Sequence, residues 1–189
     1  MQGPLANNRG AHAEGVQTLA YAYASHSEGR NTDALKEYAH AEGFATAANG
    51  IAAHAEGENT WADSNGAHAE GTNIAEANQN GKPVYLSPRE TIYTKDGSTV
   101  QVNGPIAYNR GSHAEGVQTF AANYAAHAEG LQTDATGKAA HSEGYNTKAI
   151  GGYSHAAGMG TIASYPVQTT IGRYNATTPR NTLFSVGNG

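Results

Sequence analysis

The feature that most constrains this chain is a strict 14-residue repeat marked by histidine. All nine histidines of the 189-residue sequence lie in copies of one short motif, and neighbouring copies within each of two groups are 14 residues apart. In every copy the His lies between two Ala or Ser residues, and Gly follows three positions after it. Glu follows two positions after His in eight copies, and Thr and Ala recur six and eight positions after His. The chain is therefore expected to fold as an array of equivalent units.

A repeat of this length is too short for the helical architectures. A helical pair needs more than about 30 residues per repeat and a leucine-rich repeat at least about 20. Fourteen residues suffice for two short strands and two tight turns, which make one coil of a parallel β-roll. Nine such coils, stacked about 4.8 Å apart, would form a rod roughly 43 Å long. The 24 glycines and 6 prolines agree with many turns, and we predict an all-β fold.

The array divides into two groups at its fifth copy, where Ile74 and Glu76 replace the expected Thr and Ala. Residues 3–12 reappear with few changes as residues 104–113, so both groups open with the same segment. The predicted organisation is a first β-roll at residues 1–73, a β-hairpin insertion at 74–103, a second β-roll at 104–167 and a C-terminal connector at 168–189. In the insertion, residues 91–94 and 98–102 flank a Lys-Asp-Gly turn, and residues 84–86 are a candidate third strand.

The alternation of side chains predicts which positions face inward. Residues two apart share a face of a strand, so the small residues flanking His lie on one face, and His and Glu lie together on the other. Two thin strands can close on each other only through small residues, which places Ala, Ser and Thr inside the coil and His and Glu outside. An interior of such small residues buries little apolar area, at roughly 25 cal/mol per Å². We expect association with other chains to supply the missing stability.

The motif Ser-His-Ala-Glu-Gly at residues 112–116 resembles the head repeat of YadA-like trimeric autotransporter adhesins, whose 14-residue units carry a Ser-Val-Ala-Ile-Gly type core. The resemblance implies a left-handed parallel β-roll, a homotrimer, and a subunit interface formed by the positions that His and Glu occupy here. The His/Glu form also resembles repeats of phage tail-fibre and tail-spike proteins. Residues 171–175 and 183–189 resemble the segment that leads into a self-cleaving trimerisation chaperone in those proteins.

The expected interface is a row of His and Glu side chains, which allows four interpretations. The favoured one is structural, with His donating to Glu within or between subunits and so fixing the register of the layers. A solvated row, a divalent metal on the trimer axis and catalysis are successively weaker alternatives, and neither a cofactor nor a metal is assigned. The row comprises His12, Glu14, His26, Glu28, His40, Glu42, His54, Glu56, His68, Glu70, His113, Glu115, His127, Glu129, His141, Glu143 and His155.

Aromatic residues at variable outward positions are the candidate receptor surface. Aromatic rings on a rigid surface with few charges suit stacking on sugar rings or packing on a protein, although the same rings could be half-buried between subunits. The insertion is a second candidate contact surface, or a tolerated spacer between the two rolls. The candidate aromatics are Tyr21, Tyr23, Tyr38, Phe44, Trp61, Tyr93, Phe120, Tyr124, Tyr145 and Tyr153.

Composition and motifs exclude several classes of function. The net charge of −5 and pI near 5.9 provide no basic footprint for nucleic acid, and no apolar run is long enough to cross a membrane. No phosphate loop, nucleophile elbow or zincin motif is present, so no enzymatic activity is expected. The sequence predicts a trimeric phage tail-fibre or tail-spike segment that attaches to a host-surface glycan or protein, located on the virion. The alternatives are an adhesin head on a bacterial surface and a glycan-degrading spike.

Overall fold

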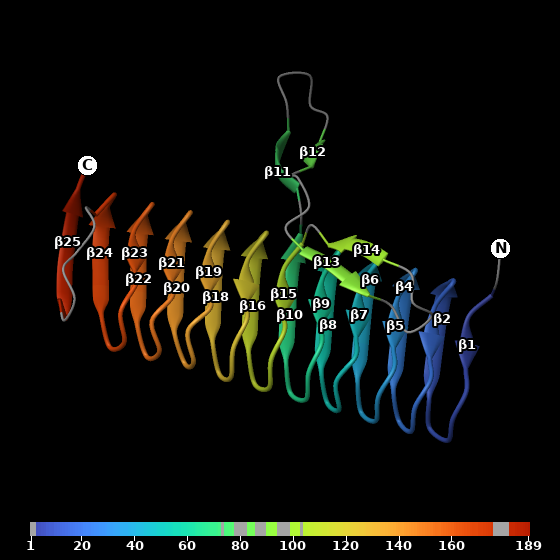
Figure 1. The fold of residues 1–189 in the computed structure, drawn as a ribbon. Helices are drawn as coiled ribbons and strands as arrows, with labels where there is room; N and C mark the ends of the chain where they lie inside the picture. Colours follow the sequence, from blue (N-terminus) through green and yellow to red (C-terminus); the bar gives the residue numbers. More distant parts are fainter. Residues whose placement is uncertain are drawn as a thin grey trace.

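The chain forms a parallel β-solenoid in the computed structural model, which describes residues 3–72, 74–77, 83–85, 90–93, 99–102, 104–175 and 182–189. Each coil contributes one long and one short strand, and these stack into two parallel sheets that face each other across a thin interior (Figure 1). The described residues contain strands, turns and bends, and no helix. The 14-residue period is therefore one coil of a β-roll, as the repeat length predicted.

The long strands form an 11-stranded sheet and the short strands a 10-stranded sheet. The long strands are β2 (His12–Val16), β4 (His26–Arg30), β6 (His40–Phe44), β8 (His54–Glu58), β10 (His68–Thr72), β16 (His113–Val117), β18 (His127–Leu131), β20 (His141–Tyr145), β22 (His155–Met159), β24 (Thr169–Arg173) and β25 (Phe184–Asn188). The short strands are β1 (Leu5–Ala6), β3 (Leu19–Ala20), β5 (Asp33–Ala34), β7 (Ala47–Ala48), β9 (Trp61–Ala62), β15 (Ile106–Ala107), β17 (Phe120–Ala121), β19 (Asp134–Ala135), β21 (Lys148–Ala149) and β23 (Ile162–Ala163).

The strands pair in a register that places equivalent residues of successive coils side by side. His pairs with His, Glu with Glu and Gly with Gly along the long-strand sheet, for example between β16 and β18. Each coil is thus one rung of the roll, and any position of the repeat becomes a row running along it. The stacked His rings measure the rung spacing, because their centroids are 4.7–4.9 Å apart.

The two groups of repeats form one continuous roll, because the fifth coil is completed across the interruption. Its long strand β10 ends at Thr72, and its short strand β15 begins at Ile106. β10 pairs with both β8 and β16, while β15 pairs with both β9 and β17. The segment from residue 104 is therefore the second half of the fifth coil and does not open a separate array. In the sequence, residues 73–103 come between the two halves of this coil.

Four strands of this intervening segment are described as two antiparallel pairs. β11 (Ile74–Ala77) pairs with β12 (Pro83–Tyr85), and β13 (Glu90–Tyr93) pairs with β14 (Thr99–Val102). The strand expected at residues 84–86 therefore lies largely within β12 and joins β11 in a sheet of its own. The expected turn at residues 95–97 lies outside the described residues.

The interior of the roll consists of small side chains, as predicted. Three positions of each coil are buried or nearly so: the Ala or Ser directly after His, the Thr six positions after His and the Ala eight positions after His. Ala128, Thr133 and Ala135 are an example. The residue just before His is also buried, as in Ala126. In the coils that carry the His motif, the described inward residues are small, so the two sheets approach closely and the coil needs only 14 residues; in the rung of Thr169 the larger Gln168 takes the position before His and is fully buried.

The interior explains a pairing of Ser and Thr within single coils and yields a first prediction. In coils with Ser after His, its hydroxyl lies 2.7–2.8 Å from the buried Thr hydroxyl, as in Ser27–Thr32 and Ser142–Thr147. In coils with Ala at that position, several Thr hydroxyls are buried without a hydrogen-bond partner, among them Thr133. Ala128→Ser is expected to supply that partner and to stabilise the roll by about 0.5–1.5 kcal/mol.

This prediction is checked by thermal unfolding, in which Ala128→Ser should raise Tm by about 2–4 °C. Ala156→Ser is the matched control, because the hydroxyl of Thr161 in that coil already donates to the carbonyl of Ala157 at 3.1 Å. The gain there should be smaller. A lower Tm for Ala128→Ser would mean that the interior has no room for a second hydroxyl and would contradict the prediction.

Each coil turns at two residues in the left-handed region of the backbone. One lies five positions after His and is usually Asn or Gln, with φ of 53–58° in Asn31, Gln132 and their equivalents. Stacking of these amides, expected from the sequence, is present between Gln118 and Gln132, where Nε2 donates to Oε1 at 3.1 Å. The other lies twelve positions after His and is Ala in four coils and Tyr in two, with φ of 49–60°. The rows of turn residues form the two edges of the roll.

The parallel sheet continues beyond residue 167, where the second array was expected to end. β24 pairs with β22 in register, and β25 pairs with β24. In these last two rungs Thr169 and Phe184 stand at the His position, and Ile171 and Val186 at the Glu position. The predicted connector therefore contains two further rungs in which the His/Glu motif is replaced.

Candidate functional site

The His/Glu row is the most regular chemical feature of the molecule. It lies on the outer face of the long-strand sheet, because His and Glu alternate with the inward Ala or Ser along each strand. From His26 to His155 the imidazole rings stack in one column, with interplanar angles of 3–24°. The carboxylates form a parallel column beside them. The structure thus brings the predicted row together on one face. Among the Glu residues that form ion pairs in this row, Glu14 at the first rung is the most exposed, with 71% of its side chain exposed.

Most histidines lie within ion-pair distance of the Glu two positions later. The Nε2–Oε2 distances run from 3.2 Å in His68–Glu70 to 3.9 Å in His113–Glu115. The repeat lacks Glu only after His155, and there the ring reaches Glu143 of the preceding rung at 3.2 Å. His and Glu of one chain therefore lie close enough for the predicted contacts. Whether they are directed hydrogen bonds depends on where each N–H points.

The Nε2 atoms are close to the carboxylates but are not aimed at them. In seven histidines of the described chain, Nε2 is buried and makes no directed hydrogen bond, although Glu lies as near as 3.2 Å. These distances alone do not make hydrogen bonds, since a hydrogen bond weakens steeply when its N–H points away from the acceptor. A buried polar atom without a partner costs roughly 1–3 kcal/mol. The row therefore retains unused hydrogen-bonding capacity. The seven residues are His26, His40, His54, His68, His113, His127 and His141.

The stacked rings also disfavour protonation of one another. The pKa of His113 is lowered below its ordinary value of 6.5, first because burial disfavours the imidazolium and then because His68 and His127 lie on either side. Glu115 and Glu70 act in the opposite direction but do not compensate. The pKa values of His26 and His141 are lowered for the same reasons. At neutral pH these rings are therefore uncharged donors beside a column of carboxylates.

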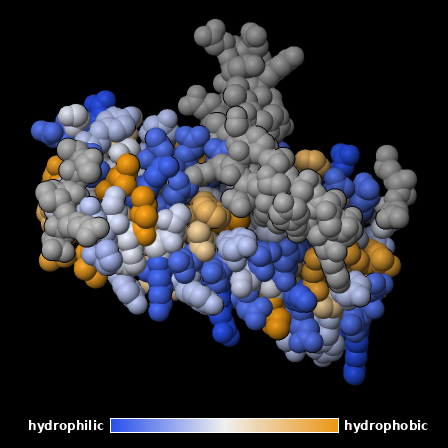
Figure 2. All heavy atoms as spheres, viewed as in Figure 1, coloured by the Kyte–Doolittle hydropathy of each residue, from blue (hydrophilic) through white to orange (hydrophobic). Residues whose placement is uncertain are grey.

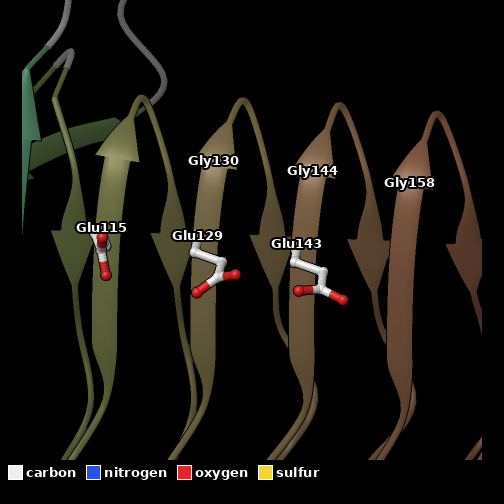
Figure 3. A pocket seen from close by; sticks show the side chains of 6 residues that line it. All are labelled: Glu115, Glu129, Gly130, Glu143, Gly144 and Gly158. Atoms are coloured by element: carbon white, nitrogen blue, oxygen red, sulfur yellow. The ribbon is translucent and has the colours of Figure 1, made fainter.

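An open groove runs beside the carboxylates because the next residue of every rung is glycine. Figure 3 shows Glu115, Glu129 and Glu143 projecting from successive strands, next to Gly130 and Gly144. These glycines have φ near 105°, and a Cβ on Gly130 would lie 2.3 Å from the carbonyl oxygen of Gly144. The glycine column is therefore required by the close stacking of the rungs, and the groove is its consequence.

Three sets of residues in the row could offer ligands to a metal. Each consists of two successive His and the Glu between them, and in each set the ligand atoms lie within 4.8 Å of one another. However, the two rings of each set are nearly parallel, with interplanar angles of 3–10°. Their lone pairs therefore point side by side, whereas a tetrahedral ion such as Zn²⁺ needs converging ligands. The sets are His68–Glu70–His113, His113–Glu115–His127 and His127–Glu129–His141.

The row ends in an apolar patch on the same face. At the last rung Phe184 and Val186 take the positions of His and Glu, and they are 59% and 62% exposed. Leu183, next to them, is 62% exposed. Neighbouring large apolar side chains on a surface mark an interaction site more often than scattered ones do. The face that carries the polar row is thus apolar where the row stops.

The candidate receptor aromatics do not form one surface. Phe44 and Tyr145 lie at the ends of long strands, while Trp61 and Phe120 pack against buried Ile106 on the outer face of the short-strand sheet. Trp61 and Phe120 are therefore partly used in packing. The side chain of Tyr93 lies outside the described residues. The remaining candidates lie in the turns that precede the long strands, and all are exposed: Tyr21, Tyr23, Tyr38, Tyr124 and Tyr153.

Two basic residues of the same turns were not among the candidates. Arg110 and Lys138 lie three positions before the next His, the position that Tyr23 and Tyr124 also occupy. Both are exposed. Numbering each residue within its 14-residue coil, instead of searching by residue type, would have identified them.

Comparison with known proteins assigns no relative to the chain. Among the residues that the structure describes, none forms a helix of the length and apolarity needed to span a membrane. No protein-family model matches the sequence, and no curated protein matches it.

Proposed function

We propose that this chain is the attachment segment of a homotrimeric surface appendage, in which three parallel rolls pack with their His/Glu rows facing a common axis. The single observation that carries the proposal is the state of the row itself. Its Nε2 atoms are enclosed within one chain, whereas the Glu side chains beside them stay exposed, from 37% at Glu143 to 71% at Glu14, and could accept from donors of a neighbouring subunit. Directed hydrogen bonds to carboxylates are stronger than neutral ones and fix the alignment of the subunits layer by layer.

The apolar end of the row supports the same packing. Three copies of Phe184 and Val186 facing one axis would form a small apolar core in a chain whose own interior consists of Ala, Ser and Thr. Burying such side chains contributes about 1.5–3 kcal/mol each. The last rung would thus tighten a trimer whose other layers are polar.

The proposed role is that of a phage tail fibre or tail spike, located on the virion, which holds receptor-binding side chains on a stiff rod. The unbroken register from β2 to β25 supports a stiff rod. The adhesin-head alternative, on a bacterial surface, is favoured by the last rung, because Phe184-Ser185-Val186-Gly187 repeats the apolar–small–apolar–Gly order of the YadA-like motif. In both roles the proposed partners are two further copies of this chain and a host-surface molecule. A left-handed coil is part of the proposal.

The test of the trimer is the native mass of the intact chain in solution. Wild-type protein is expected at three times 19.5 kDa, and Val186→Lys should shift the mass toward a single chain by placing three like charges near the axis. Val16→Arg is the matched control, since Val16 lies two positions beyond the Glu position and pairs with Arg30 in the next rung. A folded wild-type monomer at micromolar concentration would overturn the proposal.

A further inference from the structure

The turns that precede the long strands form a continuous edge of the roll, which is the lower edge in Figure 1. Backbone hydrogen bonds join the successive turns there. The amide of Ala125 donates to the carbonyl of Arg110 at 3.1 Å, and the amide of Ala139 to that of Tyr124 at 2.8 Å. The amide of Tyr153 donates to the carbonyl of Lys138 at 2.7 Å. These bonds stack the side chains of Arg110, Tyr124 and Lys138 on adjacent rungs, with Tyr153 on the next.

Cationic and aromatic side chains alternate along this part of the edge. The order is Arg110, Tyr124, Lys138 and Tyr153, one for each rung, and all four are exposed. Tyr124 is 52% and Tyr153 59% exposed, and the Lys138 Nζ lies 6.0 Å from the centroid of the Tyr153 ring. We define these four residues as the basic aromatic edge. Hydrophilic side chains project along the lower edge of the roll in Figure 2.

The edge is positively charged and rigidly built. The turn residues 108–111, 122–125, 136–139 and 150–153 contain one Arg and one Lys and no carboxylate. The side-chain oxygens of Asn109 and Asn123 accept from the backbone amides of Arg110 and Tyr124 at 2.9 Å and hold two of the turns in shape. A ligand therefore meets side chains that project from a preorganised backbone, which lowers the entropic cost of binding.

The spacing of the edge suits a linear polymer. Successive rungs are 4.7–4.9 Å apart, a distance comparable with the length of one sugar residue along an extended polysaccharide. Cations recur at the same turn position on every second rung, and Tyr124 and Tyr153 also lie two rungs apart, with Tyr153 one position later in its turn, after Gly152. Rings could therefore stack on alternate sugars while cations pair with the acidic groups of the sugars between them. We propose that the basic aromatic edge binds an acidic polysaccharide that carries its carboxylate or sulfate groups on alternate sugar residues.

The first half of the chain provides an internal comparison. Residues 9, 23 and 37 are the counterparts of residues 110, 124 and 138 in the duplicated sequence, and the same backbone bonds stack them. Arg9 and Tyr23 are shared, but Glu37 stands where the second half has Lys138. A carboxylate in the middle of the edge repels an acidic ligand. The inference therefore assigns the site to the second half alone.

The test is affinity electrophoresis of the intact protein through gels that contain hyaluronan, which has one carboxylate per two sugars, or neutral dextran. Hyaluronan should retard the wild-type protein and dextran should not. Lys138→Glu, which reproduces the first half, should weaken retention at least tenfold. Tyr153→Ala should weaken it severalfold, and it places at this turn the residue found there in Ala24, Ala52, Ala125 and Ala139. Glu37→Lys completes the same Arg-Tyr-Lys order in the first half and should strengthen retention by hyaluronan.

The proposal is overturned if hyaluronan does not retard the wild-type protein, if dextran retards it equally, or if Lys138→Glu migrates as wild type. It is also overturned if Glu37→Lys and Lys138→Glu act only through net charge, with equal and opposite shifts in both gels. The site deepens the proposed attachment function but does not depend on the trimer. Native mass measured on the same samples separates the two, since a monomer that binds hyaluronan would contradict the trimer alone.

Discussion

Gly130→Ala is expected to destabilise the roll by about 3 kcal/mol or more, because two separate penalties coincide at this position. Its φ of 105° lies in a region that L residues rarely adopt, at a cost of about 1–3 kcal/mol. The added Cβ would also lie 2.3 Å from the backbone oxygen of Gly144, which can withdraw only if the two rungs separate. Thermal unfolding should show Tm lowered by about 6–12 °C.

Gly111→Ala is the control, because it lies at a turn where the added Cβ meets nothing within 4 Å. Its φ of 63° is close to that of Ala24 and Ala125 at equivalent turns. The array accepts alanine there, so Tm should change by no more than about 2 °C. Equal losses for the two variants would show that the tight stacking of the glycine column is not what the fold requires.

Acidification is expected to weaken the protein, with a lower Tm at pH 5 than at pH 8. The pKa values of His26, His113 and His141 are lowered from 6.5 in the folded chain, mainly by burial and by the neighbouring rings. The folded chain therefore binds fewer protons than the unfolded chain. Stability is full above pH 6.5 and falls as the pH drops below it. In the proposed trimer, further acidification protonates Glu and leaves cationic rings facing one another.

The measurement is Tm and native mass at intervals from pH 8 to pH 4. His113→Gln should reduce the loss of Tm toward pH 5, since it removes one buried ring from the column. His12→Gln should reduce it less, because His12 comes after burial and His40 among the causes that lower the pKa of His26, and it lies at the first rung with 62% of its side chain exposed. A Tm and mass that stay constant over this range would contradict burial of the row between subunits.

The repeat predicted the coil well because one physical rule acts at every copy. Alternation along a strand fixes that Ala128 faces inward while His127 and Glu129 face outward, and identical rungs repeat the result. The direction of each imidazole N–H did not follow, because it depends on how the ring turns within the column. The bond expected between His and Glu of one chain is accordingly present as proximity without alignment in seven histidines, and as a hydrogen bond between His155 and Glu143.

The missed features are those in which position matters more than residue type. The sequence did not predict the last two rungs, because Thr169 and Phe184 stand where the other rungs have His. The Gly position of the repeat is nevertheless kept, by Gly172 and Gly187. The repetition of residues 3–12 at residues 104–113 predicts that each array opens with the same segment and that the first array ends in the fifth copy. Residues 5 and 6 are in fact the short strand of a coil, and their counterparts Ile106 and Ala107 complete the fifth.

The fifth coil sets an expectation for how the chain folds. Every other coil between His12 and His155 closes after 14 residues, whereas His68 meets its neighbour His113 across 45 residues. Loop-closure entropy rises with the logarithm of length, so this step costs about 1 kcal/mol more than the others. The halves on either side can propagate by local contacts alone. We therefore expect the pairing of β10 with β16 to be the slowest step of folding. The same pair of strands is expected to separate first when the roll is pulled along its axis.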